Sequence, residues 1–362
     1  MINNTIIVLD GQAGSCGKGK FCGYIAKKYN IDIAINNWGS NAGHTYVTED
    51  NKKIVLQHIP CSLVNEHTQL LIGPGAIITP EILTNEIDNN AELLNHRKIV
   101  IHPRAMIIKE KHREFERQNL KNGSTFKGCG SAIAEKVLRL NDVELMKDYY
   151  NKLPSSVKNT IVINDTVDYM DNEKSILIEG SQGFDLDINF GINYPYVTSR
   201  QCNASQLIAD CGIAPFWVKD IIMVIRPYPI RISNKTELGV DCFSGDYSNS
   251  NEITWKEIKQ RCNAPEDVDI TEYTTVTKKV RRVFEMNWDR LKYAVKINCP
   301  TQIALNFVQY IDWNAYKCKE YEKLSQKVKE FIKEVEDTTG VPVTLIGTGP
   351  NNDDIIDLNN AR

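Results

Sequence analysis

The chain has 362 residues, 42% of them hydrophobic and 25% charged, and its formal net charge is −3. This composition is that of a globular protein with enough apolar residues for a core, and the charge excludes a global basic field for nucleic acid or membranes. The 10 cysteines include no Cys-x-x-Cys pair, and the six histidines do not pair at ligand spacing. We therefore expect free thiols in a reducing compartment, and neither a disulfide framework nor a zinc site.

The first residues lead directly into an apolar strand, without a charged and apolar leader, and no apolar run reaches the length of a membrane span. These features predict a cytoplasmic protein. No repeat, low-complexity segment or linker divides the chain. We expect a single domain over residues 1–362, of the α/β class, with a mainly parallel central β-sheet flanked by helices.

Short apolar runs recur along the chain and predict the strands of this sheet, because buried parallel strands are hydrophobic throughout. In chain order the runs are Thr5–Leu9, Ile31–Ile35, Lys98–Ile101, Thr160–Ile163, Ile176–Ile178, Trp217–Ile225, Ile303–Val308 and Val343–Ile346. Apolar residues at helical spacing predict helices over Arg281–Ile297 and Cys318–Val335. Residues 238–269 are polar, acidic and poorly periodic, and are predicted to form an excursion on the surface.

A glycine-rich loop follows the first strand, where residues 10–20 read DGQAGSCGKGK. Its glycines let the backbone approach an anion closely, while Lys18, Lys20 and the start of a helix add positive charge. The loop therefore predicts a phosphate site; a tight turn without a ligand is the alternative. Its spacing departs from the standard P-loop, since Gly19 stands where that pattern has a hydroxyl residue for magnesium. The spacing of the dinucleotide-binding fingerprint is absent as well.

Four later strings carry further chemistry. Residues 39–45 (GSNAGHT) supply donors, and His44 is a candidate acid beside a phosphate loop. Residues 179–187 (EGSQGFDLD) follow a strand, where α/β enzymes bind ligands, and Gln182 offers an amide to a base carbonyl. Residues 274–282 (TTVTKKVRR) place hydroxyls before four cations, which suits a carboxylate or phosphate. Residues 346–350 (IGTGP) form a strand end with a tight turn. The alternatives are a structural loop histidine for His44, simple packing around a rigid turn for Tyr194–Val197, and a solvated helix start for residues 274–282.

These five strings, in this order, resemble those of the adenylosuccinate synthetase family over nearly the whole chain. The family's first loop reads Gly-Asp-Glu-Gly-Lys-Gly-Lys, its second string Asn-Ala-Gly-His-Thr, its third Glu-Gly-Ala-Gln-Gly and its last Ser-Thr-Gly-Pro. The resemblance implies a P-loop-related fold and a Mg²⁺-dependent ligase that couples L-aspartate to a purine nucleotide. A nucleoside triphosphate first phosphorylates the purine 6-oxygen, and the aspartate amine then displaces phosphate.

Carried over by position, the resemblance implies roles for many residues. The catalytic residues would be Ser15, Lys18, His44 and Gln182, and magnesium would meet Ser15 and the Gly43 carbonyl. The triphosphate donor would meet Gly14, Ser15, Cys16, Gly17, Lys18, Gly19, Lys20, Gly43, His44, Thr45, Arg281, Phe307, Gln309, Gly347, Thr348 and Gly349. The acceptor nucleotide would meet Ser15, Asn41, Ala42, Thr125, Lys127, Arg139, Gln182, Thr198 and Lys279. Aspartate would meet Thr275, Val276, Thr277, Lys279 and Arg281.

Three of these positions are occupied by cationic side chains that need separate comment. Lys127 and Lys279 stand where the family has arginines, so each loses planar bidentate geometry. Arg139 matches an arginine that reaches across the family's dimer interface. The resemblance therefore implies a homodimer.

Ser15 replaces the family's catalytic aspartate, and Cys16 replaces the neighbouring glutamate. That aspartate takes the N1 proton of inosinate, and a serine cannot act as a strong base. A serine is shorter and uncharged, so it leaves room for the 2-amino group of a guanine and can accept its hydrogen bond. The substitution resembles the viral branch of the family, which uses deoxyguanylate (dGMP) to make 2-aminoadenine for DNA.

The donor site also departs from the family, whose GTP is recognised by a Thr-Lys-Leu-Asp string. Gln309 stands at the aspartate position and Phe307 at the lysine position. A neutral amide can accept from N6 of adenine and donate to N1, whereas an acid can only accept. We therefore predict ATP or dATP as donor, with Phe307 stacked on the base; drift at Gln309 without a change of donor is the alternative.

The leading hypothesis is a ligase that joins dGMP and L-aspartate and hydrolyses ATP or dATP. We expect no nucleic-acid or membrane partner. The reaction would take place in the cytoplasm, which is the host's cytoplasm if the chain is viral. An adenylosuccinate synthetase using IMP and GTP is the second hypothesis, and it needs another base for N1. A non-catalytic nucleotide sensor is the third. Loss of the aspartate motivates it, and the presence of Lys18, His44 and Gln182 argues against it.

Overall fold

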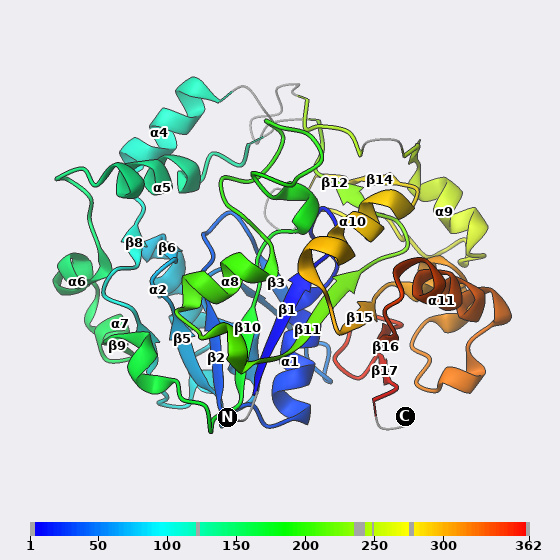
Figure 1. Cartoon of the computed structure of the whole chain (residues 1–362), viewed down its shortest axis with the longest axis horizontal. Coiled ribbons are helices and arrows are strands. Elements are labelled where there is room, and N and C mark those ends of the chain that lie inside the picture. Colours follow the sequence, from blue (N-terminus) through cyan, green and yellow to red (C-terminus); the bar gives the residue numbers. More distant parts are fainter. Residues whose placement is uncertain (1–3, 121–123, 235–242, 248–249, 275–278, 360–362) are drawn as a thin grey trace.

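The computed structural model describes residues 4–120, 124–234, 243–247, 250–274 and 279–359. A 10-stranded sheet runs through the middle of the molecule (Figure 1). From one edge to the other its strands are β17 (Ile355–Asp357), β16 (Val343–Gly347), β15 (Gln302–Leu305), β11 (Val218–Ile225), β1 (Thr5–Asp10), β10 (Ile176–Glu179), β2 (Ile33–Asn36), β5 (Gln69–Ile72), β7 (Ile99–Ile101) and β9 (Ile161–Ile163). Neighbouring strands are parallel except β16 and β17, which are antiparallel. The predicted fold class is confirmed.

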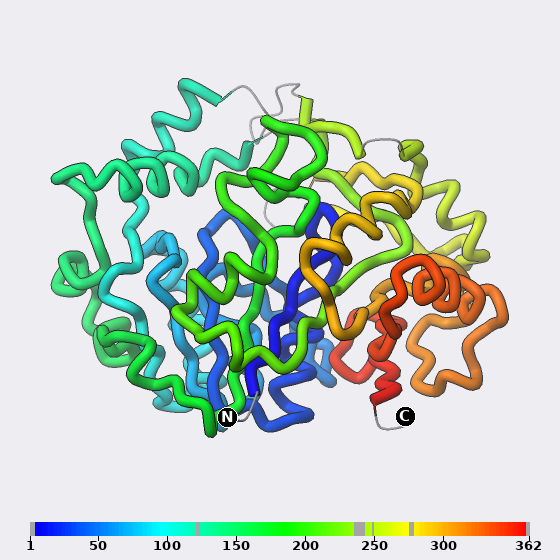
Figure 2. Tube along the Cα trace, viewed as in Figure 1, coloured from blue at the N-terminus to red at the C-terminus, as the bar shows by residue number. Residues whose placement is uncertain are grey.

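Two apolar cores cover the two faces of the sheet. Ile7 and Leu9 of β1 belong to the core that includes α8 (Ala204–Cys211), α10 (Trp288–Asn298) and α11 (Gln326–Thr339), and Val8 belongs to the core that includes α1 (Lys18–Lys28) and α2 (Pro80–Asn89). Both faces of the sheet are therefore shielded from water, which explains why the strand sequences are continuous apolar runs. Figure 2 shows β1, in blue, in the middle of the molecule with later segments on both sides of it.

The remaining helices lie around these layers. They are α3 (Ala91–Leu94), α4 (Glu110–Asn119), α5 (Cys129–Leu138), α6 (Met146–Tyr149), α7 (Ser155–Lys158) and α9 (Trp255–Arg261). Helices α4 and α5 pack on each other and lie at the upper left of Figure 1. None of the helices that the structure describes is long and apolar enough to span a membrane.

Short strands form three further sheets. They are the antiparallel pair β3 (His44–Val47) and β4 (Lys53–Leu56), the parallel pair β6 (Ile77–Ile78) and β8 (Met106–Ile107), and the antiparallel sheet β12 (Ile230–Arg231), β14 (Arg282–Phe284) and β13 (Glu252–Ile253). Within residues 238–269, β13 and α9 contribute the buried side chains of Ile253, Trp255 and Ile258 to a small apolar cluster. Ile230, Val283 and Tyr310, from outside this segment, complete the cluster, so β13 and α9 are packed onto the rest of the chain.

The helix predicted over Arg281–Ile297 is wrong in its first part. Arg282–Phe284 pairs with β12 and β13 as strand β14, and helix α10 begins only at Trp288. The Asn287 side chain accepts a hydrogen bond from the amide of Arg290 and so caps the helix at that point. The helix predicted over Cys318–Val335 likewise begins later, at Gln326, because Tyr321–Lys323 forms a separate 3₁₀ turn.

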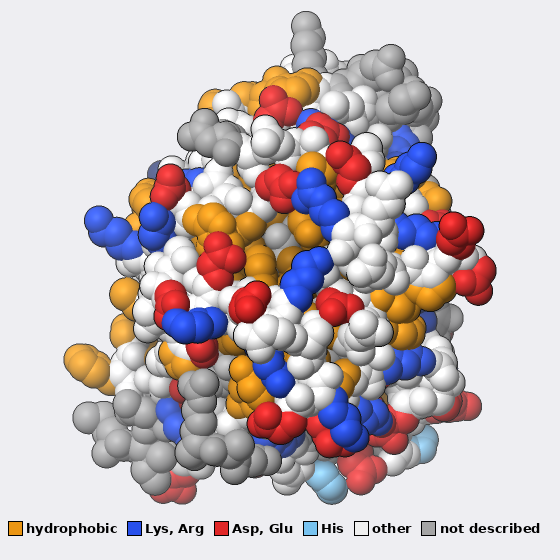
Figure 3. All heavy atoms as spheres, turned by 90° about the vertical axis from the view of Figure 1, so that its right-hand side faces the viewer, with side chains coloured by type: hydrophobic (Ala, Val, Ile, Leu, Met, Phe, Trp, Pro, Cys, Tyr) orange, Lys and Arg blue, Asp and Glu red, His pale blue; other side chains and the backbone are white. Residues whose placement is uncertain are grey.

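The face that carries α9 and α11 has side chains of both charges interspersed with apolar ones (Figure 3). No single class of side chain dominates this view. That pattern is typical of an ordinary protein surface.

Candidate active site

Loops that follow the carboxyl ends of β1, β2, β10, β15 and β16 enclose a cleft of about 560 Å³. Parallel α/β sheets bind ligands at this edge. The predicted site residues that line the cleft are Gly14, Ser15, Gly17, Lys18, Gly19, Lys20, Asn41, Ala42, Gly43, His44, Thr45, Thr125, Lys127, Gln182, Lys279, Arg281, Phe307 and Gly349. Among the residues that the structure describes, five lysines and one arginine line the cleft, against one carboxylate, that of Glu272. The field in the cleft therefore favours an anionic ligand.

An adjoining cavity of about 420 Å³ extends the cleft toward α4 and α5. Asn41, Thr125, Lys127 and Gln182 line both spaces, and Thr198 lines the adjoining cavity. The residues predicted for the acceptor nucleotide thus lie along one continuous surface, except Arg139.

Some predicted site residues lie elsewhere. Arg139 follows the end of α5 and lines neither space, while Cys16, Gln309, Gly347 and Thr348 are buried behind the wall of the cleft. Thr275, Val276 and Thr277 lie outside the residues that the structure describes.

The phosphate loop is closed by Asp10, a residue that sequence reasoning missed. One oxygen of its buried carboxylate accepts from the amides of Gln12 (2.9 Å) and Gly14 (3.3 Å). The other accepts from the Cys16 amide (3.1 Å) and from Nζ of Lys18 (3.2 Å). Asp10 therefore neutralises part of the positive charge of the loop from the interior of the protein. The available signal was an acid at the carboxyl end of the first strand.

Asn306 fixes the loop from the other side. Its side-chain amide donates to the Cys16 carbonyl at 2.9 Å. A Cβ on Gly17 would lie 2.2 Å from Nδ2 of Asn306, and one on Gly347 would lie 1.9 Å from its Oδ1. Both positions therefore need glycine because the Asn306 side chain passes directly over them.

Lys18 and Lys20 have different partners. Nζ of Lys18 also donates to the Gln182 carbonyl at 2.6 Å, so the lysine lies between the first and third strings. Nζ of Lys20 donates to the carbonyls of Gly349 (2.7 Å) and Asp354 (2.8 Å), and burial lowers the pKa of Lys20 to about 7. Lys20 therefore ties α1 to the turn after β16.

His44 is held by Glu179, whose role the sequence did not reveal. Nδ1 of His44 lies 2.7 Å from Oε1 of Glu179, and Oε2 of Glu179 accepts from the Cys61 amide at 2.7 Å. The His44 ring also packs edge-on against Trp38 with centroids 4.0 Å apart. Burial lowers the pKa of His44, while the hydrogen bond to Glu179 raises it. His44 and Glu179 therefore form an oriented acid–base pair, with Nδ1 committed to the carboxylate.

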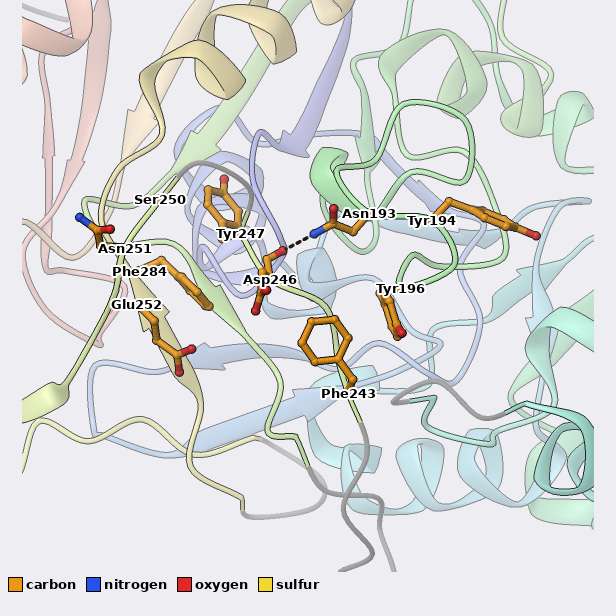
Figure 4. Close-up of a pocket in the computed structure, with 10 residues that line it drawn as sticks. All are labelled: Asn193, Tyr194, Tyr196, Phe243, Asp246, Tyr247, Ser250, Asn251, Glu252 and Phe284. Atoms are coloured by element: carbon orange, nitrogen blue, oxygen red, sulfur yellow. Dashed lines mark hydrogen bonds between the residues drawn. The ribbon is translucent and has the colours of Figure 1, made fainter.

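A second hollow of about 740 Å³ lies apart from the predicted site residues (Figure 4). Tyr196, Phe243 and Phe284 form part of its wall, and Asp246 and Glu252 also line it. Arg282 forms ion pairs with both carboxylates. None of the described residues that line this hollow is a lysine, and none is a predicted site residue, so the cleft is the candidate active site.

Comparison with known proteins identifies the family of the chain. The family model described as adenylosuccinate synthetase matches residues 7–145 and 140–315. The adenylosuccinate synthetase of Methanocaldococcus jannaschii is 35% identical over 98% of this chain and 96% of its own, and that of Thermococcus sibiricus is 33% identical over 97% and 98%.

Two solved structures share the fold. The succinoaminodeoxyadenylate synthetase (PurZ) of cyanophage S-2L, bound to dGMP and to dATP as an energy donor, superposes with a TM-score of 0.83 at 29% identity, over 99% of this chain and 96% of that one. The fully ligated adenylosuccinate synthetase of Plasmodium falciparum has a TM-score of 0.80 at 21% identity, over 98% and 99%. The chain therefore belongs to the adenylosuccinate synthetase family, whose members are ligases that form C–N bonds.

Proposed function

We propose that this ligase condenses L-aspartate with dGMP at the purine 6-position and uses ATP or dATP as donor. One observation carries the proposal: Ser15 lines the cleft together with Lys18, His44 and Gln182. Its short, neutral side chain leaves space and an acceptor for the 2-amino group of guanine. The cyanophage enzyme, which was solved with dGMP and dATP, supports this choice of substrates.

The proposed reaction has two steps. The 6-oxygen of dGMP attacks the γ-phosphorus of the donor as the N1 proton is lost to solvent, and the bond from that phosphorus to the β,γ-bridging oxygen breaks, which releases ADP or dADP. The neutral aspartate amine then attacks C6 and gives up a proton to solvent, and phosphate leaves with the former 6-oxygen. The product is N6-succino-2-amino-2'-deoxyadenylate, a precursor of 2-aminoadenine in DNA.

The residues of the cleft divide this work. Lys18 and the amides of the phosphate loop hold the transferred phosphoryl group, and the Gln182 amide donates to the 6-oxygen as negative charge develops there. When His44 is protonated, its other ring nitrogen donates a hydrogen bond to the phosphoryl group. Glu179 stabilises this protonated form of His44. Phe307 and Gln309 are proposed to recognise the donor base.

The other predicted residues hold the remaining parts of the substrates. Asn41, Ala42, Thr125, Lys127, Thr198 and Lys279, with Arg139 of a second copy in a homodimer, are proposed to bind the acceptor nucleotide. Thr275, Val276, Thr277, Lys279 and Arg281 are proposed to bind aspartate. All the proposed substrates are cytoplasmic metabolites, and we place the reaction in the cytoplasm.

Magnesium fits this cleft as a partner of the donor phosphates. Gly43 and Ser15 line the cleft and offer a carbonyl and a hydroxyl oxygen, the ligand type that magnesium prefers. Glu272, the carboxylate among the described lining residues, is already paired with arginines. We propose that Gly43 and Ser15 hold Mg²⁺, which would neutralise phosphate charge during transfer.

An adenylosuccinate synthetase that uses IMP and GTP is the second candidate, favoured by the names of the curated archaeal relatives. The two functions are separated by measuring nucleoside diphosphate release and product mass with L-aspartate, Mg²⁺ and each pairing of dGMP or IMP with ATP, dATP or GTP. We expect fastest turnover with dGMP and ATP or dATP. Turnover with IMP alone contradicts the proposal.

A further inference from the structure

An ion pair in the wall of the cleft joins the fully buried Arg226 to Glu272, a carboxylate that lines the cleft. Arg226 directly follows β11 and is 0% exposed. Its Nη1 lies 3.1 Å from Oε2 of Glu272, and its Nη2 lies 2.5 Å from Oε1. This is the two-pronged geometry in which an arginine fixes a carboxylate most firmly.

The ion pair touches residues proposed for different substrates. Nη1 of Arg226 also donates to the carbonyl of Ser15 at 3.1 Å, and the guanidinium lies 4.4 Å from the centre of the Phe307 ring. Oε2 of Glu272 accepts from Nη1 of Arg281 at 2.9 Å. The pair therefore connects the phosphate loop, the proposed donor-base wall and an arginine proposed to bind aspartate.

Two of these neighbours have backbone conformations that need support. Ser15 has φ 57° and Phe307 has φ 64°, both in the left-handed region. For a residue with a large side chain such as Phe307 this region is costly, so surrounding contacts must hold it. Arg226 contacts both residues, through the Ser15 carbonyl and the Phe307 ring.

Glu272 is well suited to orient Arg281. Burial raises its pKa, but the charges and hydrogen bonds of Arg226 and Arg281 outweigh this and lower the pKa of Glu272 overall. Tyr310 donates to Oε1 of the same carboxylate at 3.1 Å. A carboxylate fixed by these partners leaves the Arg281 guanidinium little freedom at the edge of the cleft.

We propose that Arg226 and Glu272 are positioning residues, which hold the donor site and the aspartate site in one geometry. This role rests on the proposed placement of donor and aspartate. It extends that placement by making the two sites depend on a shared pair of side chains, neither of which transfers a proton or a phosphoryl group.

The test replaces the pair with apolar residues of similar length, Arg226→Met and Glu272→Leu together. Such replacements of buried ion pairs usually keep or improve folding, whereas Glu272→Gln alone would leave Arg226 buried and uncompensated. We expect a melting temperature close to that of the wild type. We also expect the KM for L-aspartate to rise roughly tenfold and ATP binding measured without acceptor to weaken severalfold, as loss of charge-assisted contacts predicts.

The matched control is a second ion pair far from the cleft, Lys28 with Asp357, replaced as Lys28→Met and Asp357→Leu. It links α1 to β17 at the opposite end of α1 from the phosphate loop. We expect this double variant to keep the wild-type KM and ATP affinity. If the Arg226 and Glu272 double variant folds and keeps them as well, the pair is only structural and the proposal is wrong.

Glu272→Asp keeps the test decisive if the double variant does not fold. It retains the charge that compensates Arg226, but its side chain is one methylene too short to hold Arg226 and Arg281 together. We expect a raised KM for aspartate, and an unchanged KM would overturn the proposal. All variants are compared with the wild type on the substrate pair that the wild type uses fastest, so a preference for IMP and GTP would refute the proposed function without affecting this comparison.

Discussion

Ser15 combines a left-handed backbone conformation, φ 57°, with a position in the wall of the cleft. Aspartate tolerates this backbone better than most residues, so Ser15→Asp should fold. The longer, charged side chain would crowd the 2-amino group of dGMP and supply a base for N1 of IMP. We expect kcat/KM for dGMP to fall about 100-fold and turnover of IMP to appear, measured as nucleoside diphosphate release.

Ser15→Asn is the matched control for this change. Asparagine has the size of aspartate and also tolerates the left-handed region, but it is not a base. We expect it to weaken use of dGMP without allowing use of IMP. If Ser15→Asp still prefers dGMP over IMP, Ser15 does not select the acceptor.

Some residues of the candidate site could be predicted from the sequence, and others could not. Lys18, His44 and Gln182 come from glycine-rich strings at strand ends, and the fold brings them into one cleft because parallel strands end at the same edge. Glu179 and Arg226 act through partners more than 40 residues away in the chain. Such pairings depend on the tertiary fold, which no local pattern encodes.

At the scale of elements, His58 joins the segment after β4 to the start of α2. It is 1% exposed, and its Nε2 accepts from the Thr79 amide at 3.1 Å. Burial lowers the pKa of His58 to about 3. Between pH 6.5 and 3 the unfolded chain therefore binds a proton that the folded chain excludes, and stability falls as the pH falls.

We expect protonation of His58 in the unfolded chain to lower the free energy of unfolding by about 2 kcal/mol as the pH falls from 7 to 5. His58→Gln offers an acceptor to the Thr79 amide but does not titrate, so denaturant unfolding should show a smaller loss for this variant over that range. Glu86, whose buried carboxylate accepts from the His58 amide and whose pKa burial raises to about 7, acts in the opposite direction but is present in both proteins. The exposed His67 provides the control, since His67→Gln should lose as much stability as the wild type. Equal losses in wild type and His58→Gln would contradict the assignment.

The elements of the main sheet followed from local sequence because each central strand is buried on both faces and reads as one apolar run. Two strands of this sheet were not predicted: β5, at Gln69–Ile72, although its run is equally apolar, and the short edge strand β17, at Ile355–Asp357. Arg282–Phe284 was assigned to a helix because Val283 and Trp288 fit helical spacing, whereas pairing with β12 and β13 decides its conformation. Tertiary pairing overrides local periodicity most easily in such short segments.

At the scale of the whole molecule, the end of α5 exposes an apolar surface. Val137 is 71% exposed, Leu138 is 65% exposed and Leu140 is 46% exposed, and Arg139 stands among them. Burying a leucine of this kind contributes about 1.5–3 kcal/mol. We propose that this surface is part of a homodimer interface, which would carry Arg139 toward the acceptor site of the partner subunit.

Replacing Val137 and Leu138 by aspartate should therefore separate the copies, because two carboxylates would be buried without partners in the interface. We expect light scattering after gel filtration to show the mass of a dimer for the wild type and of a monomer, 41.1 kDa, for this double variant. The KM for the acceptor nucleotide should rise as Arg139 is withdrawn. Phe216→Asp, which changes another exposed apolar residue on the 3₁₀ turn Pro215–Trp217, should leave both mass and KM unchanged. A double variant that keeps the wild-type mass would place the interface elsewhere, and a monomer with the wild-type KM would show that Arg139 serves only its own chain or none.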